Sequence, residues 1–414
     1  SPPSSRVVMA RRLVAASMCL AAASAAGPRL PIPEFSIRLD LAPEERFTEV
    51  LQHFQGPLQN FVRHLHGHNP VVKLLLGELV KHRGPENDEL QAEIRNVAKI
   101  LGVTEAEVQA MQLFYELNTI MVPIVNLTGF VPDMHLDDVV DLLANSAAGH
   151  ARDRPFPIHV GCTGIIATDD NDGTVYHARN LDFSFAKYLQ AMAYTGIFTR
   201  YGTEIFRAQT IAGYSPILTG MRKGANGFSI EINTRFTDHV GGYREYLHNL
   251  FVEKREISGW TKRKILENRV SYEDAVEAFS NTPYAASEYN IVSGVRKGVI
   301  LARNPDGLAY KLPLNESSKK YIIMTNFDYV WHDIKEYFDP STAKGIFHPR
   351  RQAAEKILDS AAVMTPELLF DVLNDDAVMA KDTIFQVIMN VETGLWNASL
   401  PACADCRGSV DILV

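Results

Sequence analysis

The chain has 414 residues, of which 46% are hydrophobic, and a formal net charge of −8 at pH 7. This length suits one large domain or two ordinary domains, and the composition excludes an intrinsically disordered chain. The negative charge excludes nucleic acid as an expected partner, because phosphate binding requires positive charge. Beyond the N-terminal region, no apolar run approaches the ~20 residues needed to span a membrane.

Residues 1–26 are predicted to hold a secretory signal peptide and a few residues upstream of it. Arg11 and Arg12 precede the apolar stretch 13–22, which ends in small residues. This order is typical of a secretory signal. The alternative, an amphipathic first helix, lacks a polar stripe. The mature chain is therefore expected to be luminal or secreted, and its Asn-x-Ser/Thr sequons are predicted glycosylation sites: Asn126, Asn315 and Asn397.

The segment 27–161 has mainly helical patterning. Apolar residues recur at helical spacing over Glu44–His66 and Asn87–Leu101, and Thr104 begins a capping box for a further helix. Val71–Val80 is more apolar than a surface helix requires, which indicates a core helix or a helix that contacts lipid or a partner. Residues 121–160 are rich in Pro, Gly and Asp and are interpreted as a linker or an insertion.

From Cys162 onward, strand patterns dominate and helices interrupt them. Strands are expected at 162–168, 174–183, 228–236, 289–295, 299–302, 321–325 and 384–391. Helices are expected at 244–256, 273–280, 350–361 and 366–373. Strands that cluster after one point, with helices between them, predict an α+β fold in which helices cover a β-sandwich.

The cysteine count isolates one thiol. Cys19 leaves with the signal peptide, and Cys403 and Cys406 are expected to form a small C-terminal disulfide loop. Half of a zinc site or a redox motif are the alternatives for that pair. Cys162 is then left over, and an unpaired cysteine in a secreted protein is either inert and buried or kept for its reactivity.

A predicted hairpin surrounds Cys162 with groups that suit a nucleophile. The first strand begins at Cys162, and the returning strand carries Arg179 and Asp182. A cation and a positioned carboxylate are the groups that tune a thiol, although the two could also form an ordinary surface ion pair. Cleavage of the Gly161–Cys162 bond would place an α-amine on the nucleophile, and such an amine could accept the thiol proton.

No metal or cofactor is predicted. His64, His66 and His68 are close in sequence, but Gly67 ends the helix there and no acidic ligand is near.

The sequence resembles the N-terminal-nucleophile amidases that include acid ceramidase and N-acylethanolamine acid amidase. The resemblance runs from about Pro33 to Cys406 and is carried by several ordered segments: Phe114–Leu117, Cys162–Ala167, Tyr176–Phe183, Ala212–Tyr214, Leu218–Gly220 and Thr325–Asp328. It implies an αββα fold and autocleavage at Gly161–Cys162 into a helical α-subunit of residues 27–161 and a catalytic β-subunit of residues 162–414. The two subunits are expected to stay together as a heterodimer, in the lysosome or as a secreted protein.

The resemblance also implies a reaction and a set of site residues. Cys162 is expected to attack the carbonyl of a fatty-acid amide, either an N-acylethanolamine or a ceramide, and to form an acyl-thioester. The substrate is expected to be presented at membranes or micelles. Asp182 is expected to hold the α-amine, Arg179 to line the site and Asn326 to donate to the oxyanion. Asn326 could also be only a turn former at a strand end. Arg350 resembles one of the family's paired arginines.

The sequence departs from the family pattern at three places. Thr234 stands where the family usually has a glutamate that pairs with a site arginine. Residues 121–161 separate Phe114–Leu117 from Cys162, whereas in the family this segment runs almost directly into the nucleophile. Gly161 replaces the apolar residue that usually precedes the cleaved bond. Two alternative functions follow: an amidase of the bile-salt or penicillin V acylase type, or a catalytically silent homologue that binds lipid. The long region before Cys162 argues against the first.

Overall fold

A computed structural model describes residues 30–67, 83–113, 115–116, 161–183, 185–235, 245–246, 248–326, 328 and 350–401. The signal peptide, the possible insertion, Asn126, Cys403 and Cys406 lie outside these residues, so the predictions on them stay predictions. None of the helices in the described part of the chain combines the length and the apolar character required to cross a membrane.

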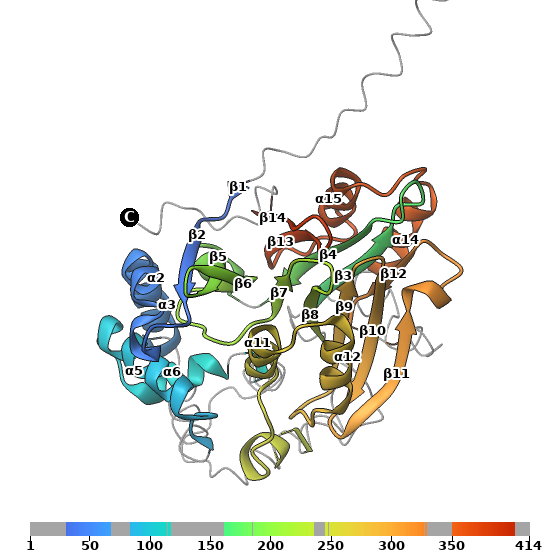
Figure 1. The fold of residues 1–414 in the computed structure, drawn as a ribbon. Helices are drawn as coiled ribbons and strands as arrows, with labels where there is room; N and C mark the ends of the chain where they lie inside the picture. The colour runs from blue at the N-terminus through green and yellow to red at the C-terminus, as the bar shows by residue number, and fades with distance from the viewer. Residues whose placement is uncertain are drawn as a thin grey trace, which may run out of the picture.

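Two β-sheets form the centre of the molecule (Figure 1). The six-stranded sheet has the order β1 (Leu30–Pro31), β14 (Leu395–Leu400), β13 (Thr383–Asn390), β4 (Val175–Asp182), β3 (Gly161–Thr168) and β12 (Tyr321–Met324). The eight-stranded sheet has the order β11 (Gly307–Pro313), β10 (Lys297–Asn304), β9 (Glu288–Gly294), β8 (Phe228–Thr234), β7 (Thr219–Arg222), β6 (Thr203–Ile211), β5 (Ala193–Arg200) and β2 (Glu34–Arg38). Only the β2–β5 pair is parallel among the described strand pairs.

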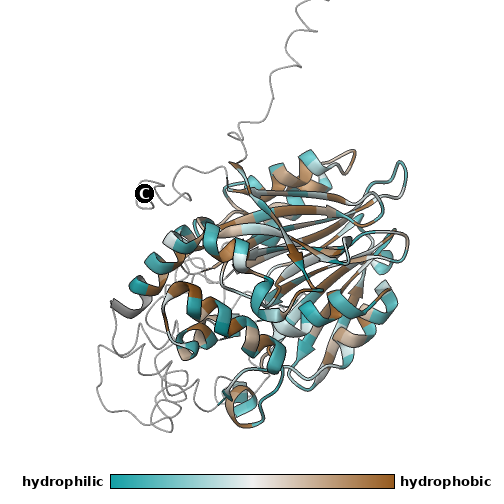
Figure 2. Ribbon diagram, turned by 60° about the vertical axis from the view of Figure 1, so that its left-hand side comes forward, coloured by the Kyte–Doolittle hydropathy of each residue, from teal (hydrophilic) through white to brown (hydrophobic). Residues whose placement is uncertain are grey.

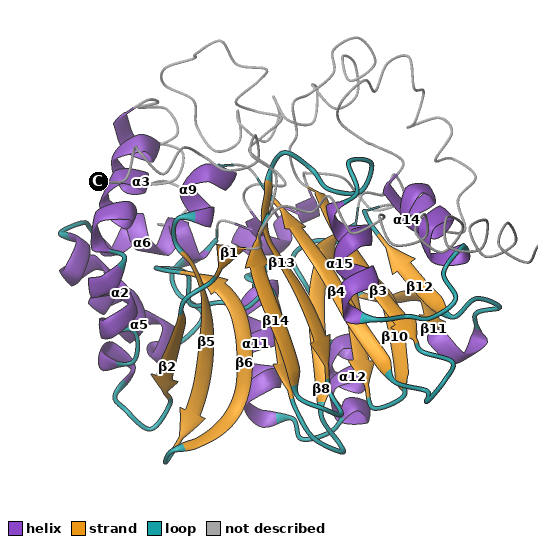
Figure 3. Cartoon of the chain, turned by 90° about the horizontal axis from the view of Figure 1, so that it is seen from above, coloured by secondary structure: helices purple, strands orange, loops and turns teal. Residues whose placement is uncertain are grey.

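The sheets pack face to face, and helices cover their outer faces (Figures 1 and 3). Ile166 and Ile322 of the first sheet pack against Ile291 and Ile300 of the second in one buried cluster. Helices α14 (Arg350–Asp359) and α15 (Pro366–Asn374) lie on the six-stranded sheet. Helices α11 (Ser258–Asn268) and α12 (Tyr272–Asn281) lie on the eight-stranded sheet. The predicted α+β sandwich with an αββα layer order is thereby confirmed.

The N-terminal helices gather beside the edge strand β2 (Figure 1). The predicted helix 44–66 is broken into η1 (Pro43–Glu45), α2 (Thr48–His53) and α3 (Gln55–Gly67), whereas α5 (Asp88–Leu101) and the capping box of α6 (Glu105–Gln112) are as predicted. Figure 2 shows hydrophobic and hydrophilic residues mixed along these helices, as expected where one face covers other structure. The segment also supplies strands β1 and β2, so it is not purely helical.

The predicted helix 244–256 is confirmed only in part, because Glu245 and Tyr246 are helical but no α-helix continues to residue 256. Within the described residues this stretch holds the five-residue π-helix η2 (His248–Val252), and Lys254 has a φ of 53°, which no α-helix accommodates. Glu256 then forms an isolated β-bridge with Tyr284.

The remaining short helices are α9 (Ala186–Gln190) and η3 (Leu314–Glu316), and η3 places the sequon residue Asn315 on the surface. Asn397 is half-buried in β14.

Candidate active site

The hairpin of β3 and β4 sets the positions of three predicted site residues. Cys162 is opposite Leu181, and Gly161 is opposite Asp182. Because side chains alternate across a strand, Cys162 and Arg179 point toward the second sheet, while Asp182 points to the face covered by α14. The bond between Gly161 and Cys162 therefore has Arg179 on one face of the hairpin and Asp182 on the other.

Cys162 is completely buried and makes three polar contacts. Its backbone N–H donates to Oδ1 of Asn326 at 3.1 Å, its carbonyl oxygen accepts from Nη1 of Arg350 at 3.1 Å, and its Sγ accepts from Nη2 of Arg179 at 3.6 Å. Burial raises the pKa of the thiol to about 11, although the Arg179 charge acts in the opposite direction. The uncleaved chain thus holds this thiol in its protonated form.

Arg350, the first residue of α14, connects the other predicted residues. Its Nη1 donates to Oδ2 of Asp182 at 2.8 Å as well as to the Cys162 carbonyl, and its Nη2 donates to Oδ1 of Asn326 at 2.7 Å. A planar guanidinium suits this task because it presents several donors in fixed directions. The structure therefore brings together all five residues that the sequence singled out as catalytic, Arg179 included.

Asp182 is buried beside this arginine. Its Oδ1 accepts from the Thr383 hydroxyl at 2.6 Å, and its Oδ2 accepts from Arg350. Burial raises the pKa of Asp182 to about 6, although the Arg350 charge favours the ionised form. Arg179 and Asp182 have exposed fractions of 0% and 1%, so the alternative of an ordinary surface ion pair is wrong.

Asn326 follows strand β12 and is also fully buried. Its Oδ1 accepts from Cys162 and Arg350, and its Nδ2 donates to the carbonyl oxygen of Thr234 at 2.8 Å. The side-chain amide carries two hydrogens on Nδ2, and the bond to Thr234 uses one of them. Asn326 thus links Cys162 to β8, a contact that exceeds the role of a simple turn former.

Arg179 lies between the sheets, and mostly uncharged groups hold it. Its Nη1 donates to the Leu218 carbonyl at 2.5 Å and to the Thr219 hydroxyl, and its Nη2 donates to the Ile232 carbonyl at 2.7 Å. The carboxylate that approaches it is Glu231, whose Oε1 lies 4.0 Å from Nε. Arg179 therefore has an acidic neighbour, Glu231, although Thr234 stands where the family usually has a glutamate.

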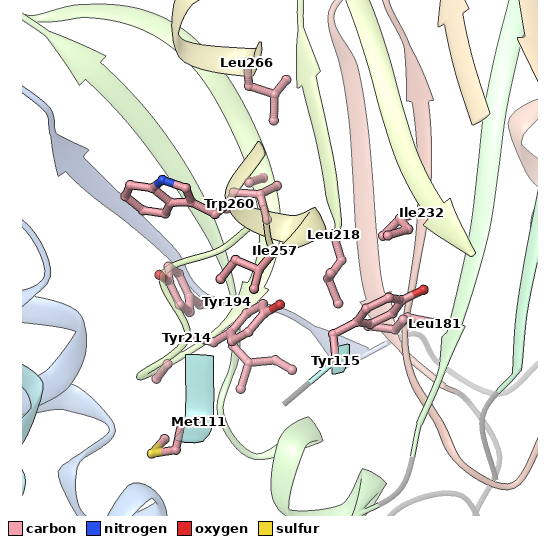
Figure 4. Close-up of a cluster of buried hydrophobic side chains, with 14 of the residues drawn as sticks. Met111, Tyr115, Leu181, Tyr194, Tyr214, Leu218, Ile232, Ile257, Trp260 and Leu266 are labelled. Atoms are coloured by element: carbon pink, nitrogen blue, oxygen red, sulfur yellow. The ribbon is translucent and has the colours of Figure 1, made fainter. Parts of the chain in front are cut away.

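The segment before residue 121 reaches into the same region. Tyr115 stacks on Phe183 with ring centroids 6.0 Å apart, and its phenolic oxygen accepts from the Thr234 hydroxyl at 3.0 Å. Figure 4 shows Tyr115, Leu181 and Ile232 as members of one cluster of buried hydrophobic side chains. A small cavity behind Thr234 is lined by Tyr115, Glu116, Ser258, Tyr284, Ala285, Ala286, Ser287 and Glu288.

Sequence reasoning missed Thr383, Glu231 and His177 as neighbours of the site. Thr383 and Glu231 belong to no motif, and His177 lies in the segment Tyr176–Phe183 but was given no role. A search for three or more His, Cys, Asp or Glu side chains arranged to hold a metal found none within the described ranges.

Comparison with known proteins places the chain beside a group of amide hydrolases. It is 27% identical to the N-acylethanolamine-hydrolyzing acid amidase of Caenorhabditis elegans over 315 residues, which cover 73% of this chain and 76% of that protein. It is 26% identical to the acid ceramidase of Mus musculus over 408 residues, with 92% and 89% covered, and 25% identical to the acid ceramidase of Homo sapiens over 405 residues, with 91% and 88% covered.

A solved structure of the Caenorhabditis elegans N-acylethanolamine-hydrolyzing acid amidase ortholog matches with a TM-score of 0.47 and 28% identity. This match covers 61% of this chain and 97% of that one. No family model matches the sequence.

Proposed function

Because this chain belongs to the family of acid ceramidase and N-acylethanolamine acid amidase, we propose that it hydrolyses the amide bond of a fatty-acid amide. The proposed substrates are N-acylethanolamines or ceramides, and the products are a free fatty acid and an amine. Cys162 is the nucleophile, and it acts after the Gly161–Cys162 bond has been cleaved. The proposed enzyme is a heterodimer of residues 27–161 and 162–414, in the lysosome or secreted.

The observation that carries this proposal is the set of bonds made by Arg350. One guanidinium joins the carbonyl of Cys162, the carboxylate of Asp182 and the amide of Asn326. These groups come from β3, β4 and the end of β12, and they meet around a single buried thiol. A packing cysteine has no need of such an arrangement, whereas a nucleophile requires oriented charges and donors.

The raised thiol pKa explains why cleavage would be needed. A thiol with a pKa of about 11 is a poor nucleophile at acidic or neutral pH. Cleavage would leave an α-amine on Cys162 itself, with a reference pKa of about 7.7–8.0. The amine would replace the peptide nitrogen that now bonds to Asn326, and it would lie close to Asp182, the partner of Gly161 in the β-ladder.

The proposed reaction then has two steps. The α-amine takes the thiol proton, Sγ bonds to the carbonyl carbon of the substrate, and the second Nδ2 hydrogen of Asn326 donates to the oxyanion. The C–N bond breaks as the ammonium returns the proton to the departing amine. Water then attacks the thioester carbon, which releases the fatty acid and restores the thiol. Arg179 keeps its positive charge beside Sγ throughout.

Hydrolysis of a fatty-acid amide by the purified full-length protein tests this proposal. After incubation at acidic pH, the protein should release fatty acid from an N-acylethanolamine or a ceramide held in detergent micelles. Cys162→Ala should release none, and Cys162→Ser, which keeps the size of the side chain and a weaker nucleophile, should retain at most a small residual rate. Hydrolysis by Cys162→Ala would overturn the mechanism. No hydrolysis of either amide by the wild-type chain would favour a silent lipid-binding homologue, and cleavage of bile salts or penicillin V alone would favour the acylase alternative.

A further inference from the structure

A chain of buried polar side chains connects the two sheets behind Arg179. The hydroxyls of Ser293 and Ser229 are 2.6 Å apart, and Ser229 Oγ lies 2.7 Å from Nδ1 of His177. Nε2 of His177 lies 3.0 Å from Oε2 of Glu231. All four side chains are at most 1% exposed. This line of contacts lies in the interior of the sandwich and ends on a carboxylate.

Hydrogen-bonding capacity fixes the direction of the last contact. An ionised carboxylate only accepts, so Nε2 of His177 must carry the proton that it donates to Glu231. The other ring nitrogen is held by Ser229. His177 therefore fixes the orientation of the Glu231 side chain, as an oriented imidazole does in other carboxylate–histidine pairs.

The second oxygen of Glu231 faces Arg179. Oε1 lies 4.0 Å from Nε, and neither atom has a hydrogen-bond partner among the described residues. The Nη groups of Arg179 already bond to the backbone, to Thr219 and to Cys162. Gly164, opposite Arg179 in β3, makes room for this approach, because a Cβ there would lie 2.3 Å from Oε1.

A fully buried guanidinium needs a counter-charge, because an unpaired buried charge is strongly destabilising. Thr234 provides none. We propose that Glu231, held in place by His177, is the counter-charge of Arg179 and a positioning residue that limits thiolate formation at Cys162. This inference rests on the proposed role of Cys162 as nucleophile and adds a residue that regulates its reactivity.

Several titratable groups face Cys162 from the elements that surround it. Arg179 and Asp182 come from β4, Glu231 comes from β8, Arg350 comes from α14, and Tyr115 approaches from the N-terminal region. Of the charges that act on the thiol, Arg179 favours the thiolate, whereas Asp182 and Glu231 oppose it. Removal of the Glu231 charge alone, with Arg179 still held by the backbone carbonyls, should therefore make Cys162 more acidic.

The rate of Cys162 alkylation by iodoacetamide tests the inference in the full-length chain. At a pH well below the thiol pKa, the rate follows the thiolate fraction, so Glu231→Gln should react about tenfold faster than the wild type if the pKa falls by about one unit. Glu93→Gln is the matched control. Glu93 is a buried carboxylate that pairs with Arg263 and is not among the charges that act on the thiol, so its loss reports only faster opening of a weakened fold.

Equal alkylation rates in Glu231→Gln and Glu93→Gln would overturn the inference. If Glu231→Gln does not accumulate as folded protein, Glu231→Leu, which removes the same charge, replaces it and should also react faster than Glu93→Gln. An unchanged rate in that variant would equally overturn the inference. Alkylation does not depend on amide hydrolysis, so an inactive protein that shows the rate increase would contradict the proposed function and leave this inference intact.

Discussion

Arg263 and Arg179 are both completely buried, but they are neutralised in different ways. Arg263, on α11, pairs both Nη groups with the carboxylate oxygens of Glu93 at 2.6 and 2.7 Å, and its Nε donates to Glu267 at 2.8 Å. Burial alone would lower the pKa of Arg263, but the Glu93 carboxylate outweighs it and raises the pKa. Arg179 instead donates to backbone carbonyls and to a thiol, and its nearest carboxylate oxygen stays 4.0 Å away.

We expect this difference to separate a structural charge, Arg263, from a functional one, Arg179. The field of Arg263 is cancelled at short range by two carboxylates, so it fastens the N-terminal helices to α11 and does little else. The field of Arg179 is only partly cancelled and reaches Sγ of Cys162. We therefore expect a buried arginine held by carbonyls beside a thiol to act in a reactive centre, whereas one paired with carboxylates should act only on stability.

Replacement of Arg263 should have the largest effect on stability. Arg263→Met leaves Glu93 buried with only the longer contact to Arg46, at 3.4 Å, which should lower the free energy of unfolding by about 3–5 kcal/mol. Urea denaturation followed by circular dichroism measures this loss. Amide hydrolysis by the fraction that remains folded should be unchanged. A loss below about 1 kcal/mol would show that this ion pair is replaceable by apolar packing.

The same substitution at Arg179 should act on chemistry. Arg179→Met removes the cation beside Sγ, so the thiol pKa should rise and hydrolysis should fall by about a hundredfold or more. Steady-state hydrolysis of a fatty-acid amide measures this effect, with Arg263→Met as the matched control of equal burial. Full activity in Arg179→Met would contradict the assignment of Arg179 to the site.

Glu116 provides a carboxylate counterpart to this comparison. It is buried, its Oε1 accepts from the Ser258 N–H at 2.9 Å, and its Oε2 has no partner in the described part of the chain. Burial raises the pKa of Glu116 to about 7. Because this folded-state pKa lies above the ordinary value, the neutral form contributes its full stability below about pH 4.5, and the contribution is lost as the pH rises through 7.

Glu116→Gln keeps the acceptor and removes the titration. It should be more stable than the wild type by about 3 kcal/mol at about pH 8, with almost no difference at about pH 4.5. Thermal or urea unfolding at the two pH values measures the change. Equal stability of the two proteins at the higher pH would show that Glu116 ionises without cost, through a partner outside the described residues.

Glycine substitutions give the smallest expected effects. An alanine at Gly164 would place its Cβ 2.3 Å from Glu231 and 2.4 Å from Ile291, so Gly164→Ala should cost about 1–3 kcal/mol. Gly56 in α3 has nothing within 4 Å of an added Cβ, and Gly56→Ala should stabilise the chain by up to about 1 kcal/mol. Unfolding midpoints measure both, and a neutral Gly164→Ala would mean that the sheets separate easily at the site.

The site was partly predictable because its central residues share one hairpin. The apolar run Cys162–Thr168 and the returning strand predicted a hairpin that holds Cys162, Arg179 and Asp182, and the β-ladder then fixes their register. Arg350 and Asn326 were named only through the family resemblance, because they join the site through long-range packing. No local pattern shows that Glu231 lies behind Arg179.

Other elements were missed for a related reason. Helix α11 has the charged residues Lys262, Arg263 and Glu267 at buried positions. Because a helix is recognised in sequence by apolar residues at its buried positions, this helix shows no clear apolar periodicity. These charges are paired with residues far along the chain, as Lys262 is with Glu288. Strands β5 and β7 were missed because glycine interrupts each of them, at Gly196 and Gly220.

The central claim is that Cys162 becomes a chain terminus and then acts as the nucleophile. Intact mass and N-terminal sequencing of the purified full-length chain after incubation at acidic pH test it most directly. The account predicts two fragments, one beginning at Cys162, and none from Cys162→Ala treated identically. A wild-type chain that stays whole yet hydrolyses fatty-acid amides, or a Cys162→Ala chain cut at the same bond, would contradict it.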